Sequence, residues 1–143
     1  MATSESVITI IAVFLVLASV GAGTLSGNAS ASPPDLSVKS VTVTTPAYAG
    51  QTIYSKAVFV NSGSLSASFV PYKVEFINAQ GNAMQTVSDY VTLIANQDTA
   101  VDLPNVQNLP AGTYNVRLTL DQLMQVDESN ENNNIFEATV VVK

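Results

Sequence analysis

An uncharged apolar segment near the N-terminus constrains the possible structures of this chain more than any other sequence feature. Residues 7–23 carry no charged side chain and are apolar on every face rather than along one stripe. As a helix, the segment with its flanks would be about 30 Å long, enough to cross a bilayer or to be buried among other copies of itself. The sequence therefore predicts a hydrophobic helix over residues 1–25, a linker over 26–34 and a separate domain over 35–143.

The hydrophobic segment is open to three interpretations. The first is a cleaved secretory signal, because Ala29-Ser30-Ala31 supplies an A-x-A site, although residues 1–6 contain no Lys or Arg and carry Glu5 instead. The second is a plain membrane anchor. The third is the core helix of a helical polymer, in which every face of the segment contacts protein.

The order of residues at the start of the chain supports the third interpretation. A short polar start, an acid at the fifth position and an unbroken apolar stretch resemble the mature N-terminus of a type IV pilin or an archaeal pilin-like protein. No Lys/Arg-Gly leader junction is present, so the chain either begins at a processed residue or was never a prepilin. The resemblance implies that the acid pairs with the amino terminus of a neighbouring subunit; the alternative is that it lies in water at a favourable helix N-terminus. The residues expected to carry assembly are Glu5, Ile8, Ile11, Phe14, Leu15, Ala18 and Ala22.

Residues 26–34 have the composition of a linker. Gly27, several small Ala and Ser residues and Pro33-Pro34 cannot continue a helix, and a proline pair favours an extended conformation. Asn28 opens an Asn-Ala-Ser sequon and is a candidate for glycosylation if the protein is secreted.

The remaining residues have the composition of an extracellular β domain. The charged fraction of the chain is 11%, its net charge is −6, and it contains no Cys and no His. Low charge with many β-branched residues favours strands. Turn signals separate seven short runs, which predict a mainly-β fold, a seven-stranded immunoglobulin-like β-sandwich. The runs cover residues 36–44, 52–60, 70–78, 89–94, 99–103, 113–120 and 135–142.

The run near residue 114 shows the clearest alternation. Apolar residues alternate with polar ones from Tyr114 to Leu120, so this strand is expected to bury one face and expose the other. Tyr114 closely follows Pro110-Ala111-Gly112, a position typical of a tyrosine corner, in which the hydroxyl bonds the backbone a few residues upstream. The alternative is an ordinary core aromatic.

Residues 35–143 contain several short motifs, each occurring once, in the order expected of a known family. The most specific is the last hairpin, where Asp121 closes one strand and an acidic, Asn-rich stretch over 126–133 leads into the next. The other motifs are Asp35-Leu36, Ala49-Gly50-Gln51, Val60-Asn61-Ser62-Gly63 and the stretch from Leu109 to Tyr114. Together they resemble the CARDB family, the cell-adhesion-related domains of bacteria and archaea. The resemblance implies a seven-stranded extracellular sandwich for surface display and adhesion, without catalysis.

The acidic hairpin has the alternation of a calcium loop but lacks its key positions. Asp127, Ser129 and Glu131 alternate, yet the sixth position is Asn132 rather than Gly and the twelfth is Ala138 rather than Glu. A structural role, with Asn and Asp bonding their own backbone, is expected instead. We therefore predict no metal site and no cofactor.

Catalysis is not expected of this sequence. Without His and Cys, the chain cannot form a Ser-His relay, a Cys nucleophile or a common zinc site. Asp127, Glu128 and Glu131 are expected to lie in a solvated loop, where no carboxyl pKa is raised. Acidity without a basic patch also speaks against binding of nucleic acid.

The helix and the sandwich together predict a structural protein of the cell surface. The leading interpretation is a pilin of an extracellular type IV pilus-like filament for adhesion or motility, with helices bundled in the core and sandwiches outside. Expected partners are other copies of the chain, the membrane before assembly, and a glycan or surface-layer protein. The alternative is a single-pass envelope protein of archaellum-stator or surface-adhesion type. The two differ in whether the helix lies in protein or in lipid.

Overall fold

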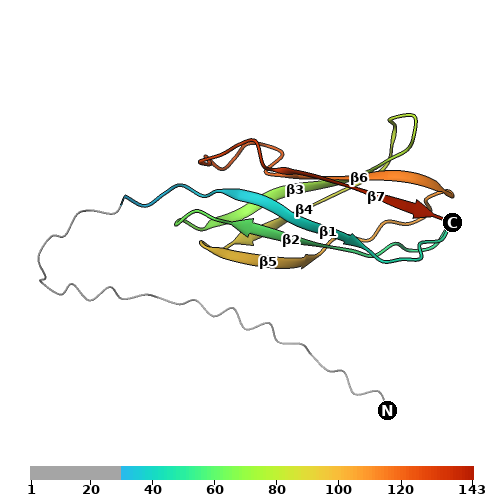
Figure 1. Cartoon of the computed structure of the whole chain (residues 1–143), viewed down its shortest axis with the longest axis horizontal. Coiled ribbons are helices and arrows are strands. Elements are labelled where there is room, and N and C mark those ends of the chain that lie inside the picture. Colours follow the sequence, from blue (N-terminus) through green and yellow to red (C-terminus); the bar gives the residue numbers. More distant parts are fainter. Residues whose placement is uncertain (1–29) are drawn as a thin grey trace, which may run out of the picture.

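The computed structural model describes residues 30–143, which contain seven β-strands (Figure 1). The predicted hydrophobic helix, all of its assembly residues and Asn28 lie outside the described residues. In the part of the chain that is described, no helix is long and apolar enough to cross a membrane. The strands are β1 (Leu36–Val43), β2 (Ser55–Asn61), β3 (Ala67–Ile77), β4 (Ala83–Leu93), β5 (Gln97–Asp102), β6 (Gly112–Leu120) and β7 (Ile135–Val142).

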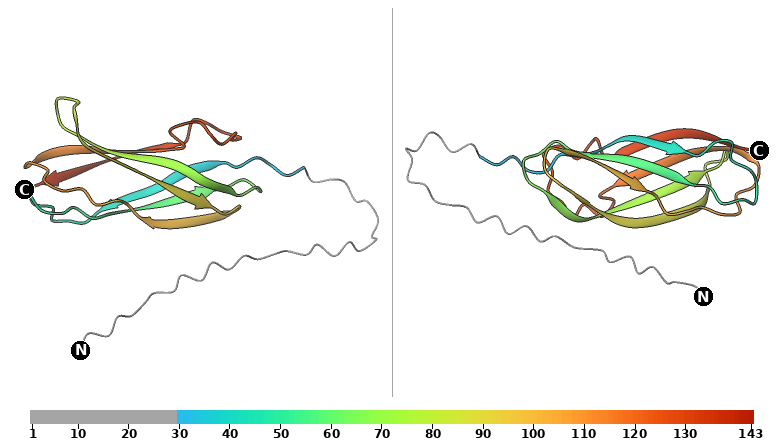
Figure 2. Two further views of the ribbon diagram at one scale, coloured as in Figure 1. Left: turned by 180° about the vertical axis from the view of Figure 1, so that it is seen from behind. Right: turned by 90° about the horizontal axis from the view of Figure 1, so that it is seen from below.

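The strands form two antiparallel sheets that face each other (Figures 1 and 2). One sheet has the order β1-β2-β5, and the other has the order β4-β3-β6-β7. Every pair of neighbouring strands is antiparallel. The predicted mainly-β sandwich is therefore confirmed.

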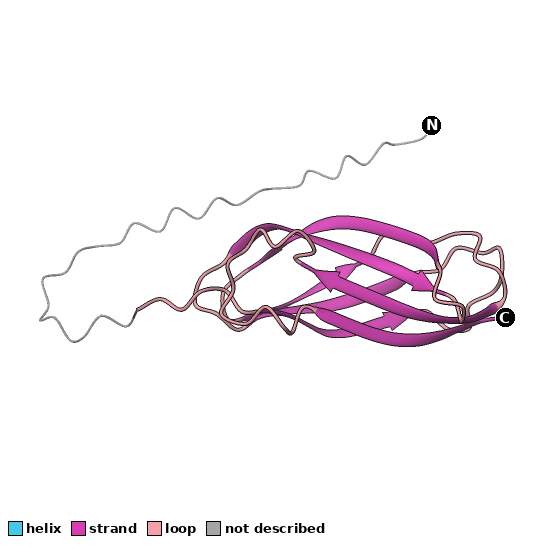
Figure 3. Cartoon of the chain, turned by 90° about the horizontal axis from the view of Figure 1, so that it is seen from above, coloured by secondary structure: helices cyan, strands magenta, loops and turns pink. Residues whose placement is uncertain are grey.

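The connecting loops gather at the two ends of the sandwich (Figure 3). The described chain enters at one end, next to the β2–β3, β4–β5 and β6–β7 loops, and the C-terminus lies at the opposite end (Figure 1). The entering segment and the C-terminus are thus separated by the full length of the strands.

Alternating side chains of facing strands fill the space between the sheets. In β6, Tyr114, Val116, Leu118 and Leu120 are all buried, as the sequence pattern predicts. The two sheets meet at the rings of Phe59 in β2 and Tyr72 in β3, whose centroids are 5.3 Å apart and tilted by 45°. A tilted aromatic pair at this separation is favourable beyond the area that it buries.

Several strand boundaries differ from those predicted, most of all the starts of β2, β3 and β4; β3 begins at Ala67 rather than at residue 70. The run over 89–94 is the second half of β4, which begins six residues earlier at Ala83. The first half of β4 is largely exposed and has no apolar alternation, so its backbone pairing with β3 defines it rather than its side chains. The run expected from residue 52 becomes β2 only at Ser55, because Ile53 instead forms an isolated bridge with Val106.

Tyr114 is a core aromatic and also makes a tyrosine corner. Its side chain is buried, and its hydroxyl donates a hydrogen bond of 2.8 Å to the carbonyl oxygen of Pro110. The bond fixes the approach of the chain to β6, four residues after the carbonyl that accepts it. The predicted corner is therefore confirmed.

Replacing Tyr114 with Phe should lower the free energy of unfolding by about 1 kcal/mol, because the Pro110 carbonyl then loses its donor while the ring still fills the core. Urea denaturation of the purified chain measures the loss. Tyr90→Phe in the edge strand β4 is the matched control, since the Tyr90 side chain is exposed and should change stability little. Equal losses in the two variants would contradict a stabilising corner.

Tyr72 should make stability depend on alkaline pH. Burial, and to a lesser degree the negative charge of Asp89, raise the pKa of Tyr72 to about 12. The folded state therefore holds the phenol proton more tightly than the unfolded chain, whose tyrosines titrate near about pH 10. The contribution of Tyr72 is complete below about pH 10 and is lost as the pH rises toward about 12, by roughly 2–3 kcal/mol at most.

The measurement is the free energy of unfolding at several values between about pH 9 and pH 12, in the wild-type chain and in Tyr72→Phe. We expect a shallower alkaline decline in the variant, because it has no phenol at that position. An identical decline in the two proteins would show that other groups cause it.

Candidate functional site

Three segments that are distant in sequence meet at the end of the sandwich where the described chain begins (Figure 1). They are residues 32–36 at the start of β1, residues 61–64 after β2, and residues 121–134 between β6 and β7. We call this region the entry junction. It brings together three of the motifs found in the sequence: Asp35-Leu36, Asn61-Ser62-Gly63 and the acidic hairpin.

The buried side chain of Asn61 joins two of these segments. Its Oδ1 accepts hydrogen bonds from the backbone N–H of Gly63 at 3.0 Å and of Asp35 at 3.3 Å. Its Nδ2 donates to the carbonyl oxygens of Leu65 at 2.8 Å and Leu93 at 3.2 Å. The side chain is fully buried, and both of its polar atoms are satisfied.

Residues 32–34, part of the predicted linker, are hydrogen-bonded to the sandwich. The backbone N–H of Ser32 donates to Ser64 Oγ at 2.7 Å, and the N–H of Ser64 donates to Ser32 Oγ at 3.1 Å. Gly63 lies so close to this segment that a Cβ there would be 2.6 Å from the Cα of Pro34. The last part of the linker therefore follows the surface of the β2–β3 loop.

Asp121 organises the start of the β6–β7 loop. This residue is buried and has a positive φ of 46°, a conformation that Asp tolerates better than most residues. Its carboxylate accepts hydrogen bonds from the backbone N–H of Gln125 at 3.0 Å and of Val126 at 2.9 Å. The chain turns tightly here, as the hydrogen bond from the N–H of Met124 to the Asp121 carbonyl also indicates.

Glu128 joins the β6–β7 loop to the entering chain. Its Oε2 accepts a hydrogen bond of 2.7 Å from the backbone N–H of Leu36, and its Oε1 accepts one of 2.7 Å from Asn134 Nδ2. Nearby, Asn133 Nδ2 donates to Asp35 Oδ1 at 2.9 Å, and the N–H of Ser129 donates to the Pro34 carbonyl. The acidic hairpin thus holds the first residues of β1.

Three carboxylates of the loop lie close together. Asp121, Glu128 and Glu131 each place one oxygen within 4.8 Å of the others. Burial raises the pKa of Glu128, the N–H of Leu36 and the amide of Asn134 lower it, and the charges of Glu131 and Asp121 raise it further. The expectation that no carboxyl of this loop has a raised pKa is therefore wrong for Glu128, because the entering chain covers it.

The sequence prediction missed Asp121 and Asn134 as members of this cluster. The calcium-loop comparison started at Asp127, which is exposed in the structure, and so it left out the buried Asp121 six residues before. The sequence feature that could have identified Asp121 is its position directly after β6, the strand with the clearest apolar–polar alternation. Carboxylate oxygens grouped in this way are of the kind that hard divalent cations bind.

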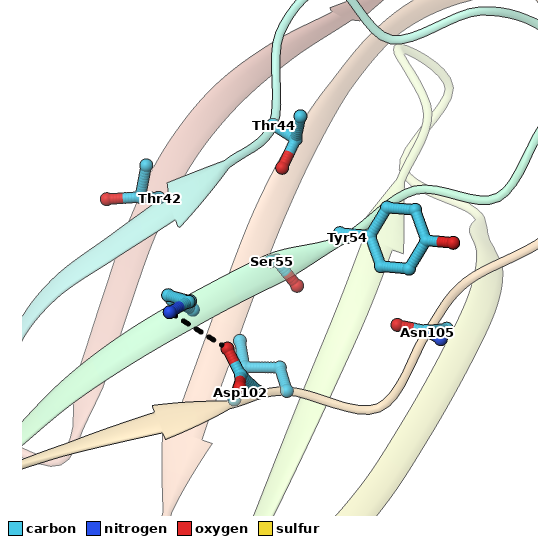
Figure 4. A pocket seen from close by; sticks show the side chains of 8 residues that line it. Thr42, Thr44, Tyr54, Ser55, Asp102 and Asn105 are labelled. Carbon is cyan, nitrogen blue, oxygen red and sulfur yellow. Dashed lines mark ion pairs between the residues drawn. The ribbon is translucent and has the colours of Figure 1, made fainter.

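A surface pocket of about 530 Å³ lies elsewhere, beside the three-stranded sheet (Figure 4). Its ionic groups, Lys56 and Asp102, form an exposed pair with Nζ 3.2 Å from Oδ1. In the described part of the chain, none of the pocket's hydroxyl groups is hydrogen-bonded to a carboxylate. The pocket is lined by Thr42, Thr44, Tyr54, Ser55, Lys56, Asp102, Leu103 and Asn105.

Comparison with known proteins gives one family match. The model of the CARDB family matches residues 33–138, a range that includes the first six strands and most of the entry junction. No curated protein matches the chain.

Solved structures share the fold at low sequence identity. The crystal structure of the CARDB domain of the PF1109 protein from Pyrococcus furiosus, in complex with di-metal ions, is 21% identical, with a TM-score of 0.63 over 79% of this chain and 96% of that chain. A domain of a candidate cell surface protein from Methanosarcina acetivorans is 24% identical, with a TM-score of 0.58 over 78% of this chain and 93% of that chain. A family 2 β-glucuronidase has a TM-score of 0.58 at 13% identity, over 75% of this chain but only 12% of its own length.

Gly63→Ala should loosen the entry junction, because the added Cβ would collide with the carbonyl oxygen of Pro33. We expect a loss of about 1–3 kcal/mol in the free energy of unfolding and faster hydrogen exchange at the Ser64 amide, which bonds to Ser32. Gly81→Asn in the β3–β4 turn is the control, since that site is open and Asn tolerates its positive φ. Unchanged exchange at Ser64 in Gly63→Ala would show that residues 32–34 are not held there.

Proposed function

The chain belongs to the CARDB family, and we propose that it is the structural subunit, a pilin, of an extracellular type IV pilus-like filament that serves adhesion or motility. In this proposal the apolar segments of residues 7–23 bundle in the filament core and the sandwiches cover the outside. The partners are other copies of the chain, with the membrane holding the subunit before assembly.

The observation that carries the proposal is the attachment of the entering chain at one end of the sandwich. Residues 32–36 are hydrogen-bonded to the β2–β3 and β6–β7 loops, while the C-terminus lies at the other end (Figure 1). In the proposed filament, a domain held in this way would project outward from the core. The loops at its far end would then meet the surroundings of the cell, as adhesion requires.

Surface placement has further support in the likeness to a candidate cell surface protein from Methanosarcina acetivorans. The proposal also excludes catalysis. It rests on the absence of Cys and His from the sequence, which removes the commonest nucleophile and general base.

The test is a double variant, Ala18→Leu with Ala22→Leu. If the apolar segment packs against neighbouring copies, larger side chains at two small positions should overpack the core and sharply reduce filament yield. Membrane insertion should remain intact, because Leu is as favourable in hydrocarbon as Ala. Electron microscopy of material sheared from cells measures filament yield, and membrane fractionation measures insertion.

The control changes shape without changing volume: Ile10→Leu with Leu17→Ile should leave the yield near that of the wild type. Wild-type yield from the Ala18→Leu, Ala22→Leu chain would contradict packing in a filament core. It would favour the alternative, a single-pass envelope protein with its helix in lipid.

A further inference from the structure

We infer that the β6–β7 loop binds a divalent cation of the calcium class between Asp121, Glu128 and Glu131, with the side-chain amide of Asn134 as a further oxygen ligand, and that the bound cation tightens the hold of this loop on the entering chain. The inference goes beyond the proposed function and does not depend on it. It would hold equally for a filament subunit and for an anchored envelope protein.

No basic side chain balances the three carboxylates. The sequence contains five Lys and Arg residues, and all five lie in the described range. Four of them pair with acids elsewhere, in the ion pairs Lys39–Asp98, Lys56–Asp102, Lys73–Glu75 and Arg117–Glu137. The fifth, Lys143, is at the opposite end of the sandwich, where its backbone bonds the 47–49 segment. Lys and Arg side chains therefore leave the charge of the cluster uncompensated.

A buried amide oxygen without a hydrogen-bond partner lies beside the carboxylate cluster. Asn134 is only 8% exposed, and its Oδ1 is buried without any hydrogen bond. The same amide group lies beside the cluster, because its Nδ2 donates a hydrogen bond of 2.7 Å to Glu128 Oε1, and the side chain lines a cavity of about 120 Å³ together with Asp121 and Glu131. Asn133 Oδ1 is a second buried oxygen without a partner. Within the described residues no donor reaches Asn134 Oδ1, and a cation bound by the neighbouring carboxylates would supply that partner.

The spacing of the carboxylates fits calcium. Ca²⁺ binds oxygen ligands at about 2.3–2.6 Å, so two ligands on opposite sides of the ion are about 4.6–5.2 Å apart. The three carboxylates each place an oxygen within 4.8 Å of the others, which lets one ion reach all of them. Mg²⁺ requires shorter distances and near-octahedral geometry, which an irregular loop supplies poorly.

A cation here would act on the entering chain through Glu128. The same carboxylate that would bind the ion accepts the N–H of Leu36, and the neighbouring Ser129 N–H donates to the Pro34 carbonyl. Fixing the loop around an ion would therefore stabilise the first residues of β1 and the segment just before them. Without the ion, mutual repulsion of the carboxylates weakens the same contacts.

The experiment is calorimetric titration of Ca²⁺ into the full 143-residue chain, purified in detergent and freed of metal with a chelator. We expect saturable binding with a dissociation constant of about 10⁻⁴ to 10⁻³ M, the range of extracellular calcium modules. Hydrogen exchange at the Leu36 and Ser129 amides should slow when Ca²⁺ is present. Mg²⁺ alone should bind at least about tenfold more weakly.

Glu131→Gln and Asp127→Asn form a matched pair of variants. Each removes one negative charge from the same loop, but Glu131 belongs to the cluster, whereas Asp127 is exposed and lies outside it. Gln keeps an acceptor for the N–H of Glu128, so the first variant should fold. We expect Ca²⁺ affinity to fall at least about tenfold in Glu131→Gln and by less than about twofold in Asp127→Asn.

Three results would overturn the inference. They are the absence of saturable Ca²⁺ binding up to about 10 mM, equal weakening in the two variants, which would mean diffuse attraction to an acidic surface, and Mg²⁺ binding as tight as that of Ca²⁺. Binding without any change in exchange at Leu36 and Ser129 would overturn the link to the entering chain. Filament yield enters none of these measurements, so failure here is distinct from failure of the proposed function.

Discussion

The entry junction depends on the buried side chain of Asn61. Its amide bonds four backbone groups, which belong to the start of β1, to the turn after β2 and to the end of β4. A buried group that loses its hydrogen-bond partner costs about 1–3 kcal/mol, so each of the four would be left at a penalty without this side chain. An aliphatic residue of similar size cannot replace these bonds. Asn61 thereby fixes the entering chain relative to both sheets, because the same side chain bonds Asp35 and the end of β4.

The junction connects the entering chain to both sheets. Leu36 begins β1 in the three-stranded sheet, whereas Leu93 ends β4 in the four-stranded sheet, and Asn61 bonds the backbone on either side of this divide. Glu128 adds a second connection, because it binds the Leu36 N–H from the loop between β6 and β7. A force on the N-terminal side of residue 32 would therefore spread over both sheets rather than peel away β1. The chain achieves this without any cysteine for a disulfide.

Sequence pattern predicted the parts of the structure in which each strand has one buried face. The apolar–polar alternation of β6 predicted which of its side chains are buried, and the short interval between Pro110 and Tyr114 indicated the tyrosine corner. Pattern failed for the first half of β4, which is largely exposed, with only Val87 packed against the core, and is defined by its backbone pairing with β3. It also failed for Glu128, since the residue that covers its carboxylate, Leu36, is 92 positions away. Contacts of that range depend on the closed fold and leave no local signal.

The carboxylates of the acidic hairpin both stabilise the loop through hydrogen bonds and destabilise it through mutual repulsion. Its carboxylates accept backbone N–H groups and so hold the loop and the entering chain in place, which favours keeping them. Grouped within 4.8 Å, they also repel one another, which opposes the same arrangement; burial first, and the charges of Glu131 and Asp121 after it, raise the pKa of Glu128. Neutral amides would supply acceptors without repulsion, so hydrogen bonding alone does not account for three acids at this point. The cation that we infer would remove the conflict, because it would bind the charges of the three carboxylates. The stiffness of the attachment would then depend on the ionic environment outside the cell, at the place where the sandwich meets the segment that precedes it.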